Sequence, residues 1–333
     1  MHNSESPVIL GVGNALVDIV TPIEQEDLLR QLGFQKGSMN LVDFSLLQKI
    51  NQLTAGLKKE LASGGSTANT MHGLAHLGVK CGFFGKVGKD ELGDIFRNDL
   101  HESGVIPSLL EGENATGRAI ALISPDSERT FATYLGAAIE LSASDLQDKL
   151  FKGYQYMHLE GYLVQNHDLV RACVKFAQRN GLKIALDLAS FNVVEANRDF
   201  LLEILEKGID IVFANEDEAR AISHQEPCDA LHFLGDKCRI AVVKLGKDGS
   251  LVKCDGKVYQ AEAFGDERVD TTGAGDLFAS GFLYGLINNY PLDLCARIGS
   301  VLAGHVIRIA GARLPEAYWD EIRNDLKSIG VEI

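Results

Sequence analysis

Short apolar runs recur along the chain, and most are followed by a longer stretch in which apolar residues have helical spacing. Five runs are predicted to be buried strands, at residues 8–12, 156–159, 183–188, 210–214 and 240–245. Helices are predicted near residues 66–77, 90–102, 167–180, 198–207 and 229–238, and residues 276 to about 328 are mostly helical. This alternation predicts an α/β fold in which a parallel sheet carries helices on both faces.

One segment departs from the alternation. Residues 116–138 contain two β-like runs joined by a predicted turn at Pro125-Asp126-Ser127. A hairpin cannot form a β-α-β crossover, so we expect it to project from the main sheet as a lid, with a β-like piece at 33–43 beside it. The alternative is an antiparallel extension of the sheet edge. We expect a single domain over residues 1–333, with lid pieces inserted at about 33–43 and 114–138.

Composition narrows the class of protein. The net charge of −14 argues against binding to nucleic acid or to an anionic membrane surface. Six cysteines without a C-x-x-C pair favour neither a zinc site nor a disulfide framework. The first 20 residues lack a basic n-region, and no window approaches the roughly 20 apolar residues that cross a bilayer. We therefore expect a cytoplasmic protein.

The stretch "DTTGAGDLF" at residues 270–278 carries the strongest chemical signal. Gly273, Ala274 and Gly275 offer unhindered backbone N–H groups at the start of a predicted helix, where the helix dipole favours anions. A carboxylate at Asp276 suits a base that takes a proton from an attacking hydroxyl during phosphoryl transfer. The structural alternative is a plain helix cap, which would not explain two glycines.

The N-terminal stretch "VILGVGNALVDI" places two glycines after a predicted strand. A dinucleotide-binding G-x-G-x-x-G motif would require glycine where Leu16 stands, so we reject that interpretation. Asn14 and Asp18 follow the strand and suit sugar hydroxyls, with local Asx-turn bonding as the alternative.

A third stretch is "SGGSTANTMHGLAHLG". Gly64 and Gly65 permit close approach of the backbone, and Asn69 offers both a donor and an acceptor to a polyol. His72 and His76 lack the glutamate of a zinc-protease motif and are interpreted as structural. No Walker-type phosphate loop is present in the sequence.

Together these stretches resemble the ribokinase-like (PfkB) family of carbohydrate and nucleoside kinases over essentially the whole chain. "DTTGAGDLFASGF" matches the C-terminal signature of the family, while "GGSTANT" and "GNALVDI" are similar to the adenosine-kinase form of the N-terminal motifs. The resemblance implies a three-layer α/β/α fold with a central, mostly parallel sheet and a small β lid. It also implies an ATP-dependent kinase that uses Mg²⁺ and, in potassium-activated members, K⁺.

The resemblance also assigns roles to residues. Asp276 matches the catalytic base, with Gly273, Ala274 and Gly275 as its anion hole. The positions that match acceptor-binding residues are Asn14, Asp18, Gly64, Gly65, Asn69 and Glu160. Those that match the ATP site are Asn215, Glu218, Lys244, Gly246 and Gly249, with Glu218 holding Mg²⁺ through water. Asp270, Thr272 and Gly311 match the ligands of a monovalent cation.

The acceptor is left open between two classes. The N-terminal motifs favour a purine nucleoside, whereas Glu160 matches a glutamate that binds the free sugar in ribokinases. A small free sugar is therefore placed first, with a nucleoside second and an inactive nucleotide-binding regulator as a remote alternative. Lid residues that could touch the acceptor or form a base pocket are Phe34, Arg118, Arg129, Phe131 and Tyr134. Lid strands could also pair two subunits into a homodimer.

Overall fold

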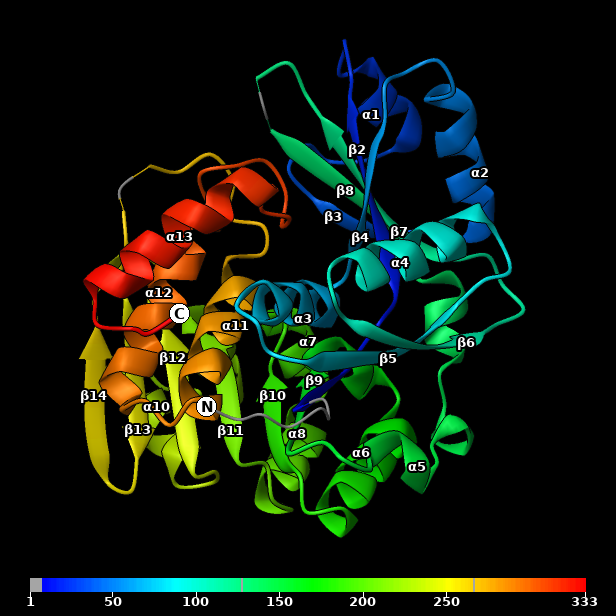
Figure 1. Ribbon diagram of the computed structural model, residues 1–333. Helices are drawn as coiled ribbons and strands as arrows, with labels where there is room; N and C mark the ends of the chain where they lie inside the picture. Colours follow the sequence, from blue (N-terminus) through cyan, green and yellow to red (C-terminus); the bar gives the residue numbers. More distant parts are fainter. Residues whose placement is uncertain (1–7, 127, 266) are drawn as a thin grey trace.

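The computed structural model describes residues 8–126, 128–265 and 267–333, which form two β-sheets surrounded by helices (Figure 1). The larger sheet has nine strands in the order β14-β13-β12-β11-β10-β9-β1-β5-β6. Its strands are β1 (Ile9–Val12), β5 (Cys81–Val87), β6 (Ile106–Glu111), β9 (Tyr156–Glu160), β10 (Lys183–Asp187), β11 (Ile211–Asn215), β12 (Ile240–Lys244), β13 (Ser250–Cys254) and β14 (Lys257–Ala261). Neighbours from β12 to β6 are parallel, whereas the β12–β13 and β13–β14 pairs are antiparallel, so that β13 alone runs against the other strands of this sheet.

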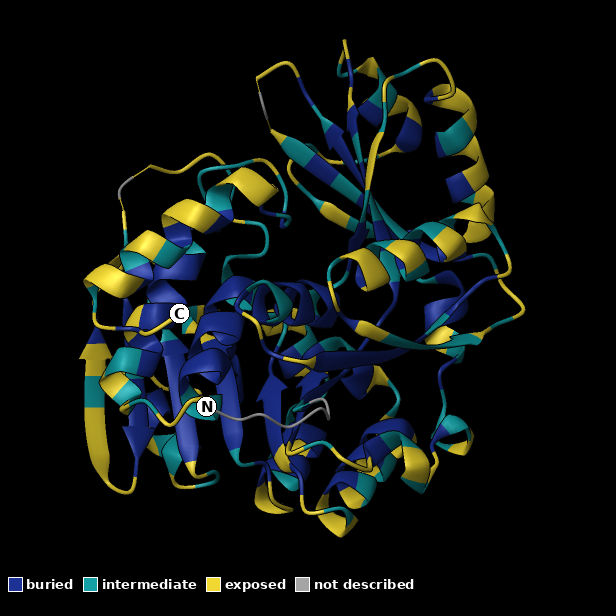
Figure 2. Cartoon of the chain, viewed as in Figure 1, coloured by how far each residue is buried: buried dark blue, intermediate teal, exposed yellow. Residues whose placement is uncertain are grey.

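Helices cover both faces of this sheet because successive strand residues point to opposite sides. In β11, Phe213 packs into one core and Val212 into the other. The first core involves α3 (Ser66–His76), α4 (Glu91–Glu102), α11 (Ala274–Ile287), α12 (Leu292–Val306) and α13 (Glu316–Ser328). The second involves α5 (Asp148–Phe151), α6 (His167–Arg179), α7 (Phe191–Ala196), α8 (Arg198–Glu206), α9 (Glu216–Ser223) and α10 (Pro227–Gly235). The inner strands are almost wholly buried between these layers (Figure 2).

The second sheet has five strands in the order β3-β8-β7-β2-β4 and stands beside the first (Figure 1). Its elements are β2 (Leu16–Pro22), β3 (Met39–Leu41), β4 (Glu60–Gly64), β7 (Gly117–Ile123) and β8 (Arg129–Tyr134), with helices α1 (Asp27–Leu32) and α2 (Phe44–Leu53). The remaining 3₁₀ turns are η1 (Gly136–Glu140), η2 (Ala143–Asp145), η3 (Gly161–Gln165) and η4 (Gly246–Asp248). We call this five-stranded sheet the lid sheet.

The predicted hairpin corresponds to the antiparallel strands β7 and β8, and the predicted piece at 33–43 contains β3, which pairs with β8. The alternative of an extension of the main sheet is wrong, because the hairpin belongs to the separate lid sheet and the main sheet ends at β14 and β6. All five strands expected from the apolar runs are present within one residue at each end. Strands β2, β4, β5, β6, β13 and β14 were not predicted. Within the described residues, no helix is long and apolar enough to cross a membrane.

Four neighbouring strands of the main sheet each end on a polar residue. Glu160 ends β9 and Asp187 ends β10, directly opposite each other in the ladder. Asn215 ends β11 and pairs in the same way with Lys244 at the end of β12. Because parallel strands bring their carboxyl ends to one edge of the sheet, these four side chains form a polar row at the edge where α/β proteins bind ligands.

Candidate active site

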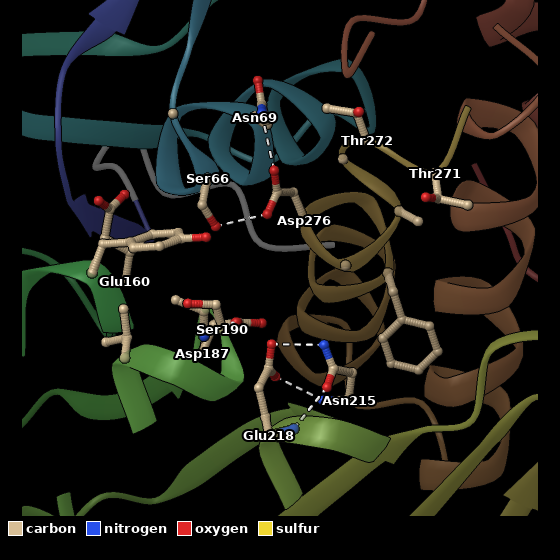
Figure 3. A pocket seen from close by; sticks show the side chains of 18 of the residues that line it. Ser66, Asn69, Glu160, Asp187, Ser190, Asn215, Glu218, Thr271, Thr272 and Asp276 are labelled. Carbon is tan, nitrogen blue, oxygen red and sulfur yellow. Dashed lines mark hydrogen bonds between the residues drawn. The ribbon is translucent and has the colours of Figure 1, made fainter. Parts of the chain in front are cut away.

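Asp276 lies in the first turn of α11 and faces the start of α3 (Figure 3). Its Oδ1 accepts a hydrogen bond of 2.7 Å from Ser66 Oγ, and its Oδ2 accepts one of 2.9 Å from Asn69 Nδ2. The N-cap of α11 is Gly273, and no side chain caps this helix end. Asp276 therefore does not act as a helix cap, and its carboxylate is held by α3 instead.

The surroundings of Asp276 alter its proton affinity. Enclosure of the carboxyl away from water raises its pKa to about 6, although the hydrogen bonds from Ser66 and Asn69 oppose the rise. A carboxyl with a pKa near neutral is a better proton acceptor than one at its ordinary value, and it is still ionised at pH 7.

The glycines ahead of Asp276 are required by the backbone. Gly273 has φ +78°, and a Cβ there would lie 2.5 Å from the Cβ of Ala312. A Cβ on Gly275 would lie 3.1 Å from Nζ of Lys244, so the lysine ammonium stands beside this loop. Backbone N–H groups and a cation thus converge near Asp276, which is the arrangement that phosphate oxygens require.

The turn between β4 and α3 packs closely on the N-terminal strands. Gly65 has φ +88°, and a Cβ there would lie 2.5 Å from the carbonyl oxygen of Asn14. A Cβ on Gly64 would lie 2.2 Å from Cγ of Asp18. Burial raises the pKa of Asp18 to about 7, while the nearby Arg313 opposes the rise. Both glycines therefore bring the backbone to the expected acceptor residues.

One of the two polar side-chain atoms of Asn69 is unpaired among the described residues. Its Nδ2 is committed to Asp276, but its Oδ1 is buried without a hydrogen-bond partner among the described residues. Buried polar atoms are nearly always paired, so an unpaired acceptor lining a cleft indicates a place for a ligand donor.

Glu160 is only 1% exposed, and its two oxygens are engaged by protein groups. Oε1 accepts from the backbone N of Asn14 at 3.0 Å and from Asn14 Nδ2 at 2.5 Å, and Oε2 accepts from the backbone N of Thr67 at 3.2 Å. Burial raises the pKa of Glu160 to about 7. These contacts favour a role in positioning Asn14 and α3 over the sugar-reading role that we expected.

Asn215 and Glu218 form a reciprocal cap at the start of α9. The Asn215 Oδ1 accepts from the backbone N of Glu218 at 2.9 Å, and Glu218 accepts from the Asn215 backbone N at 2.8 Å and Nδ2 at 2.7 Å (Figure 3). Burial raises the pKa of Glu218 to about 7, against the opposing effect of Lys244. The N-x-x-E spacing is therefore explained by a capping box at the start of α9, although both residues also line the cleft.

Lys244 pairs with Asp187 across the polar row, with 3.0 Å between Nζ and Oδ2. Burial by itself would lower the pKa of Lys244, but the carboxylates of Asp187 and Glu218 outweigh it and raise that pKa. The lysine is therefore charged. Sequence reasoning missed Asp187, although its place at the end of a predicted buried strand was a usable signal.

The side of the cleft that is expected to bind the nucleotide begins at the turn after β12. Gly246 and Gly249 have φ +54° and +87°, and a Cβ on Gly249 would lie 2.0 Å from the carbonyl oxygen of Ala261. Both glycines line the cleft. It continues along residues that were not predicted, namely Phe264, Ser300, Ala303, Gly304 and Ile307.

The three expected cation ligands meet around one carboxylate. Asp270 Oδ1 accepts from Thr272 N at 3.1 Å and from Thr272 Oγ1 at 2.8 Å, and its Oδ2 accepts from Gly311 N at 2.7 Å. The Arg129 guanidinium also contacts Asp270 Oδ2. Arg129 thus approaches the loop ahead of α11 from the lid sheet.

One cleft of about 2370 Å³ joins these groups, from the lid sheet past Asp276 to α12. A pocket for a single small ligand usually has about 300–1,000 Å³. The cleft therefore has room for two substrates, with Asp276 between its two ends.

Comparison with known proteins identifies the family and the fold of the chain. The sequence profile described as pfkB family carbohydrate kinase matches residues 36–317. The structure of adenosine kinase from Sinorhizobium meliloti is 35% identical, with a TM-score of 0.85, over 96% of this chain and 99% of that one. A probable sugar kinase from Rhizobium etli CFN 42 is 33% identical, with a TM-score of 0.86, over 96% and 98%. The 5-dehydro-2-deoxygluconokinase of Clostridium beijerinckii is 27% identical over 86% of this chain and 90% of its own length.

These matches confirm the ribokinase-like α/β fold with a mostly parallel sheet, and they make the chain an ATP-dependent phosphotransferase with an alcohol acceptor. The chain belongs to the pfkB family of carbohydrate kinases.

Proposed function

We propose that this kinase transfers the γ-phosphoryl group of ATP to the hydroxymethyl oxygen of a purine nucleoside. A small free sugar, placed first from the sequence alone, is the second candidate. The relatives include both sugar kinases and adenosine kinases, so their names do not decide between the two. The preference rests on the acceptor end of the cleft.

The acceptor end of the cleft is apolar. Its large apolar lining residues come from the lid sheet and the segment after it: Leu16, Met39, Leu41, Phe131, Leu135 and Ile139. Met39, Leu41 and Ile139 are 65%, 68% and 62% exposed, although large apolar side chains are usually covered. A flat nucleobase would cover them, whereas a free sugar has hydroxyl groups in every direction and gains little from such a surface.

Polar groups next to this apolar surface suit the ribose. Asp18 lies against the glycine turn, and Asn69 Oδ1 is unpaired among the described residues. Both side chains line the same cleft as the apolar residues, and together they offer acceptors for hydroxyl groups. Asp276 would then take the proton of the attacking hydroxyl, while the N–H groups after Gly273 and the charge of Lys244 stabilise the transferred phosphoryl group.

The donor end fits ATP with Mg²⁺. Asn215, Glu218 and Asp187 supply amide and carboxylate oxygens next to the phosphate site, which suits a largely hydrated Mg²⁺. When bound, the ion would neutralise charge on the phosphates. A homodimer through the edge strands of the lid sheet, and a cytoplasmic location, stay predictions.

The test is ATP consumption with Mg²⁺ against adenosine, inosine, guanosine, ribose and fructose. We expect turnover on at least one nucleoside and at least about tenfold lower kcat/KM on ribose, because ribose lacks the base that would bind the lid residues. Ribose or fructose turnover without nucleoside turnover would overturn the nucleoside assignment and restore the sugar. Asp276→Asn enzyme is the control for contaminating kinases.

A further inference from the structure

Arg129 joins the lid sheet to the loop that precedes the catalytic helix. It is the first residue of β8, and its guanidinium contacts Oδ2 of Asp270, 141 residues further along the chain. The two side chains are only 12% and 9% exposed. An ion pair this well covered is screened far less by solvent and salt than a surface pair.

The carboxylate of Asp270 accepts hydrogen bonds from two separate segments of the chain. It binds both the N–H and the hydroxyl of Thr272 on one side and the N–H of Gly311 on the other. Gly273, three residues after Asp270, packs directly on Ala312. Asp270 thus holds the glycine loop against residues 311–312, and any group that fixes the charge and orientation of this carboxylate also fixes the loop.

The expected site for a monovalent cation does not fit this arrangement. Its only side-chain carboxylate already has four protein donors, one of which is positively charged. A second cation at the same oxygens would be repelled by the guanidinium at close range. The positive charge beside the Asp270 carboxylate is therefore supplied by the Arg129 guanidinium.

We propose that Arg129 is a positioning residue that takes the place of a monovalent cation and makes the order of the anion-hole loop depend on the lid sheet. Because the guanidinium is carried by β8, the Asp270 carboxylate is neutralised only when the lid sheet is in place. This inference rests on the phosphoryl-transfer reaction but does not depend on which acceptor is used.

The experiment compares the wild type with Arg129→Gln and Arg129→Lys. The matched control is Lys36→Gln, which removes one positive charge from the same lid region, where Lys36 pairs with Asp126 and Glu26. Each protein is assayed with K⁺, Na⁺ or choline as the only monovalent cation at equal ionic strength. Amide hydrogen exchange of residues 267–275 is measured in parallel on the protein without substrates.

We expect wild-type kcat to change less than about twofold between K⁺ and choline. In Arg129→Gln, kcat should fall about 10–100-fold in choline, the size of loss that a displaced catalytic loop produces. Exchange at 267–275 should become faster in this variant, K⁺ should partly reverse both effects, and Arg129→Lys should lie close to the wild type. Lys36→Gln should show neither effect.

Strong K⁺ activation of the wild type would overturn the proposal, as would unchanged exchange and kcat in Arg129→Gln. Because exchange is read without substrates, faster exchange in Arg129→Gln that K⁺ reverses would support the proposal even if no nucleoside is turned over, so its outcome is separable from that of the proposed function.

Discussion

The carboxyl group of Asp276 is surrounded by groups that pull its proton affinity in opposite directions. Two hydrogen bonds from α3 stabilise its charged form, while enclosure and the nearby Asp187 destabilise it, and the result is a pKa of about 6. The same hydrogen bonds also fix where the carboxylate points. A base that is both ionised and pre-oriented needs little reorganisation when the acceptor hydroxyl arrives.

Replacement of Asp276 by asparagine should therefore affect the chemical step and little else. We expect Asp276→Asn to lower kcat by about 10²–10⁴-fold, the usual contribution of a positioned base, with ATP affinity nearly unchanged. Steady-state kinetics and titration calorimetry with ATP measure the two quantities. Asp320→Asn, on an exposed position of α13, is the matched control. Turnover within a few-fold of the wild type would contradict the assignment of Asp276 as the base.

At the scale of elements, the lid sheet contributes exposed apolar side chains to one end of the cleft. Strand β3 has only three residues and carries two of the exposed side chains, Met39 and Leu41. Its pairing with β8 places Met39 opposite Phe131 and Leu41 opposite Thr133. Under the proposed function, the lid sheet would select the acceptor, while the main sheet carries the polar row.

The variant Leu41→Gln tests whether the lid sheet binds the acceptor without affecting ATP. We expect the KM of the nucleoside to rise about 5–30-fold, since burial of a leucine side chain by a ligand is worth about 1.5–3 kcal/mol when complete. The KM of ATP should stay within about twofold, because the described residues that we assign to the donor end belong to or adjoin the main sheet, the turn after β12 and α12. Leu53→Gln, 37% exposed on α2, is the control. An equal rise in the KM of ATP, or no change for the nucleoside, would count against a base pocket under the lid.

Helices α11 and α12 approach each other through glycines. A Cβ on Gly281 would lie 2.6 Å from the carbonyl oxygen of Ile298, and one on Gly285 would lie 2.7 Å from Sγ of Cys295. Because α11 carries Asp276 at its start, this close approach sets the position of the Asp276 carboxylate.

Gly281→Ala should consequently destabilise the fold and impair turnover. Alanine is favoured in a helix by about 1 kcal/mol, but the backbone contact cannot relax without moving α12, so we expect a net loss of about 1–3 kcal/mol. Urea unfolding followed by circular dichroism measures it. Gly56→Ala, where a Cβ would meet no atom within 4 Å, is the control. Equal stability of both variants would show that the helices tolerate separation.

At the scale of the whole molecule, the active site gathers four carboxyl groups whose pKa is raised by burial. The pKa is about 7 for Asp18, Glu160 and Glu218, and about 6 for Asp276. In the native state these groups hold protons that the unfolded chain releases at lower pH. The native state therefore loses stability relative to the unfolded chain as pH rises through the folded pKa values.

We expect the free energy of unfolding to fall between about pH 5 and pH 8. Burial lowers the pKa of His158 from 6.5 to about 4, so this group makes the free energy of unfolding rise with pH between those two values. One histidine is outweighed by the four carboxyl groups. Urea unfolding at pH 5, 6, 7 and 8 measures the profile. In Glu160→Gln, which keeps the volume of the side chain, the fall should be shallower. A free energy that rises steadily to pH 8 would contradict the raised pKa values.

Much of this architecture was predictable from the sequence because its signals are local. The apolar runs that form β9 to β12 are continuous, as expected for strands buried on both faces. Strands β2 and β4 escaped prediction because they belong to a half-exposed lid sheet, in which Asp18 occupies a position inside a strand. The close backbone approach predicted at Gly64 and Gly65 is present, since a Cβ at either position would lie within 2.5 Å of Asp18 or Asn14.

By itself, the sequence determined the buried strands β1 and β9 to β12 with helices between β9 and β12, the glycine loop at the start of α11 and the carboxylate that follows it. These depend on neighbours along the chain. Only the tertiary structure decided that Glu160 is engaged by Asn14 and Thr67, that Arg129 reaches Asp270, and that apolar lid residues border the acceptor site. Those contacts join residues about 90–150 positions apart, and their partners depend on the path of the folded chain, which no local pattern records.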